Sequence, residues 1–140
     1  AILEEMNLDY VEQTVTGSND VQQAVQSIVT RCDAIYIPTD NTFASAMPLV
    51  GSVVMESGTP VICGATGMVE AGGLITLGLN YYNLGYQTGE MAVQVLEGAD
   101  PASMPVQSQN QYDYVVNEEM LSALGMELPQ SLLEKMGDAA

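Results

Sequence analysis

Four short segments of this chain combine small, hydroxyl and amide side chains, and each precedes a stretch with helical periodicity. They are residues 17–19, 38–42, 64–67 and 78–81. Because the free N–H groups at a helix N-terminus favour a bound anion, such loops could hold a carboxylate without Arg or Lys. Asp40 is the only acid among them and could bind an ammonium group. A zwitterionic small molecule suits this combination.

Each of these side chains also has a purely structural interpretation. Ser18, Asn19, Asp40, Asn41 and Thr42 are all common helix caps, and for most of them capping is the stronger expectation. For Asp40 the two roles are evenly balanced, because Asn41 or Thr42 could cap the same helix. Tyr81 and Tyr82 are assigned first to core or hinge packing.

Enzymatic chemistry finds little support in the sequence. The chain has no histidine, so no Ser-His or Cys-His pair can form. It contains neither GxxxxGK[ST] nor GxGxxG, the glycine motifs that cradle phosphates. Asp40 at a strand end invites comparison with phospho-accepting receiver domains, but these need a lysine after a later strand, and the only lysine is Lys135. We therefore predict no catalytic residue, no cofactor and no enzymatic activity.

The two cysteines are expected to be free thiols. Cys32 and Cys63 are too far apart in sequence for a CxxC site, and no histidine completes a zinc shell. Cys32 precedes one expected strand and Cys63 ends another. If these strands are parallel, the sulfurs lie at opposite ends of the sheet, beyond the roughly 7 Å Cα limit of a disulfide. We predict no metal site.

Short β-rich runs alternate with longer helical segments through the first two thirds of the chain. Strands are expected at 10–15, 34–37, 60–63 and 74–77, and helices at about 18–29, 42–56, 68–71 and 82–96. Pro48 could kink the second helix or delay its start. This alternation predicts βαβ units and a three-layer, Rossmann-like α/β fold, with a parallel sheet and helices on both faces. Ligands bind such sheets at the carboxyl ends of the strands, where the four loops lie.

The pattern changes after Gly98. Residues 100–111 read as a polar linker, followed by a strand at 112–116, a short helix at 120–124 and a final helix after Pro129. We expect this last third to pack against something other than the first sheet.

The charge balance excludes two classes of partner. The chain has eighteen acidic residues and only two basic ones, Arg31 and Lys135, which gives a formal net charge of −16. Nucleic acid and anionic lipid both require Lys and Arg to neutralise phosphates, so neither is an expected partner.

Three runs carry a specific resemblance. Residues 18–24 (SNDVQQA), 33–41 (DAIYIPTDN) and 81–89 (YYNLGYQTG) look like the ABC-type solute-binding proteins that include the tryptophan-binding proteins of Gram-positive bacteria. The similarity runs from about Ile2 to Leu133. It implies a two-lobed periplasmic-binding-protein type I fold outside the cytoplasm, as a cell-surface lipoprotein or in the periplasm. Such a protein closes on a small ligand by hinge motion and delivers it to a membrane permease.

Carried over by position, the ligand-contact candidates are Thr39, Asp40 and Asn41, with Thr66 and Asn80 behind them. An amino acid, aromatic above all, is the first expectation for the ligand. Many relatives carry an acidic residue where this chain has Ala65, so a sugar or nucleoside-like ligand stays an alternative. The same fold also serves as the effector-binding domain of repressors and receptors, which is the second hypothesis for function.

The resemblance also implies a C-terminal fragment. Residues 1–80 would form most of one α/β lobe, and 81–140 a return segment towards the other lobe, with hinge, helix, linker, strand and C-terminal helices. The family's first strand would lie between the 10–15 and 34–37 strands and is absent from the chain. We therefore expect a gap in the sheet, unpaired strand edges and self-association.

Overall fold

A four-stranded sheet in the order β1-β2-β3-β4 organises the lobe, and helices connect its strands. The computed structural model describes residues 2–138. The strands are β1 (Ile35–Ile37), β2 (Val61–Cys63), β3 (Ile75–Leu79) and β4 (Tyr112–Val116). The helices are α1 (Ile2–Glu5), α2 (Ser18–Ile28), α3 (Asn41–Ser57), α4 (Thr66–Glu70), α5 (Tyr81–Leu96), α6 (Glu118–Ala123) and α7 (Gln130–Asp138), with a 3₁₀ turn at Pro101–Ser103. The expected α/β class is confirmed.

β1, β2 and β3 are parallel, as the alternating pattern predicts. β4 is antiparallel to β3 and pairs with it from Ile75↔Val116 to Leu79↔Tyr112. The expectation that the last third packs away from the first sheet is therefore wrong for β4 and α6. Met120 of α6 belongs to the same core as α3 and α4. The physical reason is that β3 would otherwise leave its backbone groups unpaired on one side.

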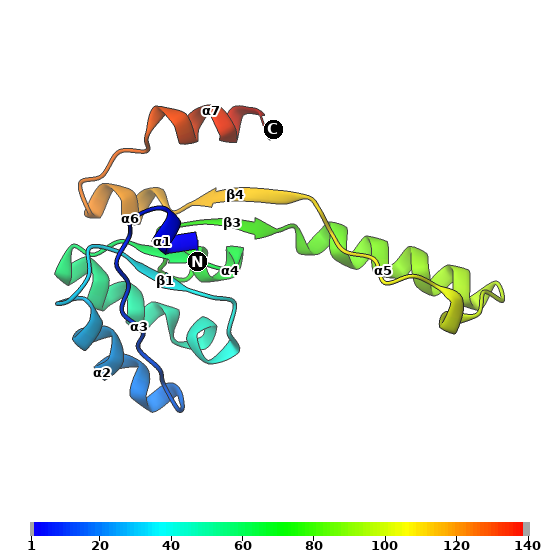
Figure 1. The fold of residues 1–140 in the computed structure, drawn as a ribbon, viewed down its shortest axis with the longest axis horizontal. Helices are drawn as coiled ribbons and strands as arrows, with labels where there is room; N and C mark the ends of the chain where they lie inside the picture. The colour runs from blue at the N-terminus through cyan, green and yellow to red at the C-terminus, as the bar shows by residue number, and fades with distance from the viewer. Residues whose placement is uncertain (1, 139–140) are drawn as a thin grey trace.

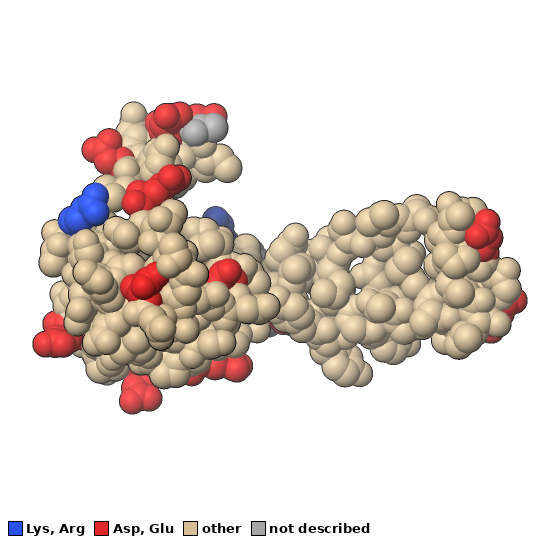
Figure 2. All heavy atoms as spheres, turned by 90° about the horizontal axis from the view of Figure 1, so that it is seen from below, with Lys and Arg blue, Asp and Glu red and all other residues tan. Residues whose placement is uncertain are grey.

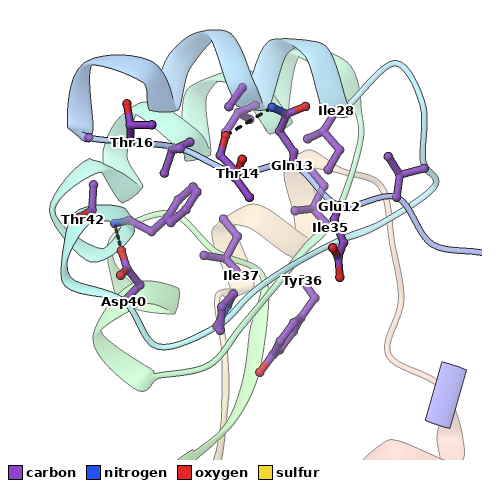
Figure 3. Close-up of a pocket in the computed structure, with 17 residues that line it drawn as sticks. Glu12, Gln13, Thr14, Thr16, Ile28, Ile35, Tyr36, Ile37, Asp40 and Thr42 are labelled. Atoms are coloured by element: carbon purple, nitrogen blue, oxygen red, sulfur yellow. Dashed lines mark hydrogen bonds between the residues drawn. The ribbon is translucent and has the colours of Figure 1, made fainter. Parts of the chain in front are cut away.

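The strand expected at residues 10–15 does not form. The segment is not paired with any strand, and β1 is the last strand on that side of the sheet within residues 2–138. A hollow of about 560 Å³ lies between residues 11–17, α2 and β1 (Figure 3). A strand needs a hydrogen-bonded neighbour, and this segment has none across the hollow. The sheet is continuous from β1 to β4, so the gap expected between two strands is not present, although β1 has the unpaired edge that was expected. Self-association through this edge stays a prediction.

One face of the sheet is buried and the other is partly open. Ile35, Ile37, Val61 and Cys63 point into a core shared with α3 and α4. α2 packs on α3, and in Figure 1 both lie below β1, while α7 lies above β4, beyond the edge of the sheet. On the face of the sheet opposite to this core, Tyr36 is 66% and Leu77 52% exposed. The helical layer is therefore dense on one face and sparse on the other.

α3 is continuous in spite of Pro48. It begins after Asp40 and ends at Gly58, whose left-handed φ of 75° favours glycine. Because proline lacks an N–H, the carbonyl of Ala44 loses its helical partner. That carbonyl lies on an exposed residue, where water can satisfy it. The helix begins at Asn41, well before Pro48, so the delayed start does not occur.

An arm extends from the lobe (Figures 1 and 2). It consists of α5 and the returning residues 97–111, and α5 has no buried residue. Two side-chain hydrogen bonds join its two halves, from Gln87 to Gln107 (2.8 Å) and from Asn83 to Gln111 (2.6 Å). In Figure 2 acidic side chains are scattered over the lobe and at the far tip of the arm, with almost none on its middle.

Candidate ligand-binding site

The carboxyl ends of β1, β2 and β3 converge on a hollow of about 350 Å³. This volume is at the lower end of the roughly 300–1,000 Å³ typical of small-molecule sites. Its lining residues come from the loops that follow β1 and β2, from the start of α3, from α4 as far as its last residue, and from the start of α5: Thr39, Asp40, Asn41, Ala44, Ala65, Thr66, Gly67, Met68, Glu70 and Tyr81. The hollow therefore lies where the carboxyl-end rule for parallel sheets places a ligand.

Four of the five residues singled out from the sequence meet in this hollow. Thr39, Asp40 and Asn41 line it from the end of β1, and Thr66 lines it from the start of α4. The fifth, Asn80, is not part of the lining. The structure thus brings most of the set together in one hollow.

Asp40 caps a helix and keeps one carboxylate oxygen free of hydrogen bonds within the described residues 2–138. Its Oδ1 accepts a hydrogen bond of 2.9 Å from the N–H of Phe43, so Asp40 is the cap of α3 (Figure 3). Asn41 and Thr42 lie inside the first turn instead. The side chain is exposed, and no hydrogen bond within residues 2–138 uses its Oδ2. A carboxylate oxygen at the hollow is therefore available to a cationic group.

The loops after β1 and β2 approach each other closely at Gly64. The hydroxyl of Thr39 donates a hydrogen bond of 2.9 Å to the carbonyl of Gly64. A Cβ at Gly64 would lie 2.5 Å from the backbone N of Thr39. Only glycine permits this approach without a backbone shift, so Gly64 sets the spacing of the two loops that line the hollow.

Both polar atoms of the Asn80 amide take part in hydrogen bonds within the protein. Its Oδ1 accepts a hydrogen bond of 2.9 Å from the N–H of Asn83, which makes Asn80 the cap of α5. Its Nδ2 donates a bond of 2.7 Å to Oδ2 of Asp113 in β4. Asn80 therefore joins the start of the arm to the edge strand of the lobe.

Tyr81 is the lining residue that the sequence reasoning assigned elsewhere. It is the first residue of α5, is 54% exposed and contributes to the hollow, whereas Tyr82 does not. The carboxyl-end rule selects the segment 78–81, which contains Tyr81, but the sequence does not show whether the ring lines the hollow or packs in a core or hinge.

The larger hollow beside β1 has a different character. Its walls are formed mainly by the extended segment 11–17, the apolar side of α2 and the unpaired edge of β1 (Figure 3). Asp40 and Thr42 border it at one end. Because it follows the side of a strand rather than the strand ends, we interpret it as the space beside the unpaired edge of β1, and the smaller hollow as the ligand site.

The loop at 17–19 contributes no cap of the expected kind. The cap position of α2 is Gly17, and Ser18 and Asn19 lie in the first turn. Asp20 instead accepts hydrogen bonds from the backbone and the hydroxyl of Thr16. These bonds lower the pKa of the Asp20 carboxyl below its usual value, and the bond from the Thr16 hydroxyl has the larger effect.

The cysteines are free, as predicted. Cys32 is half-buried and its Sγ contacts the carbonyl of Ile28. Cys63 is only 3% exposed, and burial raises the pKa of its thiol to about 11. Within residues 2–138 no cluster of three or more His, Cys, Asp or Glu side chains is arranged to hold a metal ion. None of the helices described is both long and apolar enough to span a bilayer.

Comparison with known proteins decides the family. A family profile described as ABC transporter substrate binding protein matches residues 1–139. The chain therefore belongs to the ABC transporter substrate-binding protein family. A tyrosine-binding protein of Clostridioides difficile (strain R20291) is 39% identical over 121 residues, which are 86% of this chain and 35% of that protein.

Two solved members of the family share its fold. The ABC domain of Streptococcus pneumonia in complex with L-Trp is 37% identical, with a TM-score of 0.86 over 96% of this chain and 45% of that one. A ligand-free, open structure of a substrate-binding protein with adhesive properties from Clostridium difficile is 44% identical. Its TM-score is 0.72 over 92% of this chain and 44% of that chain. The periplasmic-binding-protein-like fold expected from the sequence is thus confirmed.

The chain spans between about a third and a half of the length of these relatives. Substrate-binding proteins of ABC transporters are binding proteins and not enzymes.

Proposed function

We propose that this chain forms one side of an extracytoplasmic solute-binding component of an ABC importer. In this proposal it binds an amino acid, preferably an aromatic one, between two lobes and delivers it to a membrane permease. The proposal rests mainly on one observation: a single hollow at the strand ends is lined by Thr39, Asp40, Asn41 and Thr66. Two relatives add support, since one is called a tyrosine-binding protein and the other was solved with L-Trp.

The same proposal assigns two parts of the chain to different lobes. Residues 1–80 would supply most of one lobe, and the arm within 81–140 would lead into the second lobe. The hollow of about 350 Å³ is the share of the site that this chain supplies. The opposite wall would come from the part of the longer relatives that has no counterpart here.

The available groups suit an α-amino acid. Oδ2 of Asp40 would pair with the ammonium group, as a charge-assisted hydrogen bond that is roughly twice as strong as a neutral one. The first N–H groups of α3, a helix of 17 residues, favour the carboxylate. Ala44, Ala65 and Met68 provide apolar surface for the side chain. The chain needs neither Arg nor Lys for this arrangement.

The experiment is a calorimetric titration of the chain and of a chimaera. In the chimaera, this chain replaces the matching part of the pneumococcal relative, so that both walls are present. L-Trp, L-Tyr, L-Leu, a monosaccharide and a nucleoside are titrated. We expect the chimaera to bind the aromatic amino acids and to melt at a higher temperature as their concentration rises.

Asp40→Asn tests the chain's own contribution. Removing a charge-assisted contact worth roughly 1.5–3 kcal/mol should weaken binding about ten- to a hundred-fold. Glu56→Gln is the matched control, because Glu56 is an exposed acid in the last turn of the same helix. Binding of the monosaccharide or the nucleoside, with no binding of any amino acid, would overturn the proposed ligand class. Equal affinities for Asp40→Asn and Glu56→Gln would overturn the assignment of Asp40.

A further inference from the structure

The start of the arm places one aromatic ring beside the polar loops of the hollow. We propose that Tyr81 stacks on the planar side chain of the ligand and sets the preference for aromatic amino acids, and that Asn80 is a positioning residue that fixes Tyr81. This inference rests on the proposed function, because it assumes that the hollow binds an amino acid.

Tyr81 differs from every other lining residue. It is the single aromatic residue among those that line the hollow, and about half of its surface is open to solvent. The other apolar side chains there are those of Ala44, Ala65 and Met68, which offer little flat surface. Aromatic pairs contribute roughly 0.5–1.5 kcal/mol beyond the burial of their area. Tyr81 is therefore the group of this chain that can distinguish a planar from a branched aliphatic side chain.

The hydrogen bonds of Asn80 hold Tyr81 in place from two directions. The bond from Asn83 fixes the first turn of α5, and the bond to Asp113 ties that turn to β4. A further bond of 2.6 Å from Asn83 to Gln111 strengthens the same junction. Because Tyr81 lies between Asn80 and this turn, its backbone has little freedom to rotate away from the hollow.

Tyr82 shows that the position, and not the residue type, carries the argument. It follows Tyr81 directly in the same helix, is 80% exposed and is absent from the lining. Successive helix residues point about 100° apart, so only the first of the two rings faces the hollow. Tyr82→Leu is therefore a matched control for Tyr81→Leu.

The test compares the affinities of the chimaera for L-Trp and L-Leu by calorimetry. Tyr81→Leu should lower the preference for L-Trp by about two- to ten-fold, the factor that corresponds to a stacking contribution of roughly 0.5–1.5 kcal/mol. Tyr81→Phe keeps the ring and should keep the preference, as should Tyr82→Leu. If Tyr81→Leu does not unfold cooperatively, Tyr81→Met replaces it, since the exposed position tolerates a flexible side chain.

The role of Asn80 is tested by the same measurement, the ratio of the affinities for L-Trp and L-Leu. Asn80→Ala should lower the preference for L-Trp, and it should lower it no further in a Tyr81→Leu background, because the two residues act through one ring. A loss of affinity that is equal for L-Trp and L-Leu would make Asn80 merely structural and overturn this part. An unchanged preference in Tyr81→Leu, with L-Trp still preferred by the unsubstituted chimaera, would overturn the inference while leaving the proposed function intact. If no amino acid binds the unsubstituted chimaera, both fail.

Discussion

Gly64→Ala is the substitution that tests most directly how the two loops of the hollow meet. The added Cβ would lie 2.5 Å from the backbone N of Thr39 and 2.8 Å from its Oγ1. The first of these atoms belongs to the backbone and cannot rotate away, so one loop must shift. Overpacking of this kind costs roughly 1–3 kcal/mol, and loss of the Thr39–Gly64 hydrogen bond adds about 1 kcal/mol. We expect the free energy of unfolding to fall by about 2–4 kcal/mol.

The assay is urea unfolding of the chain, followed by far-ultraviolet circular dichroism. With a slope of about 2 kcal/mol per molar urea, the expected loss lowers the midpoint by about 1–2 M. Gly67→Ala is the control, since nothing lies within 4 Å of a Cβ at that position and Gly67 is inside α4. Alanine there should raise the stability by up to about 1 kcal/mol. Equal midpoints for the two variants would refute the close approach of the loops and, with it, the geometry of the hollow.

Two further predictions concern β1 and its neighbour β2. Amide hydrogen exchange should be slow at Ile35 and Gly64, because their N–H groups donate hydrogen bonds to the carbonyls of Pro60 and Ile37, respectively. Exchange should be fast at Tyr36, whose N–H lies on the unpaired edge of β1. Slow exchange at Tyr36 would show that a strand occupies this edge. Burial raises the pKa of the Cys63 thiol from 9.0 to about 11. The contribution of this protonated thiol to the free energy of unfolding should therefore be complete below pH 9 and be lost as the pH rises towards 11. Urea midpoints across this range should fall in the unsubstituted chain and fall less in Cys63→Ala, and parallel declines in the two would contradict this.

The helices and the inner strands were predictable because their signals are local. The apolar spacing of Val21, Ala24 and Val25 predicts α2, and all three are buried. The continuous apolar run around Ile35–Ile37 predicts a buried parallel strand, and β1 occupies it. The hollow was predictable in the same way, since the carboxyl-end rule needs only the order of strands and loops.

The errors arose where a non-local partner decides the structure. Residues 10–15 have the composition of a strand, but a strand forms only beside another one, and the neighbouring position is empty. Residues 112–116 were expected away from the sheet, because composition does not reveal which edge they meet. Asn80 does not line the hollow, and its amide hydrogen-bonds to Asn83 and Asp113, so a ligand contact by Asn80 stays a prediction. No pattern in the sequence shows which of two competing partners an amide takes.

The arm gives a separate physical argument for a second lobe. Around the axis of α5, the polar side chains of Asn83, Gln87, Glu90, Gln94 and Glu97 occupy one narrow sector, and small or apolar residues occupy the rest. A helix that is apolar around most of its circumference is normally buried, yet Tyr82, Tyr86 and Leu96 are all exposed here.

An isolated helix of 16 residues is only marginally stable in water, so α5 requires cover that the lobe does not provide. The pneumococcal relative matches 96% of this chain, α5 included, and has more than half of its length left over. In the proposed two-lobed protein, the part that corresponds to this remaining length would cover α5 and close the hollow over Asp40 and Tyr81.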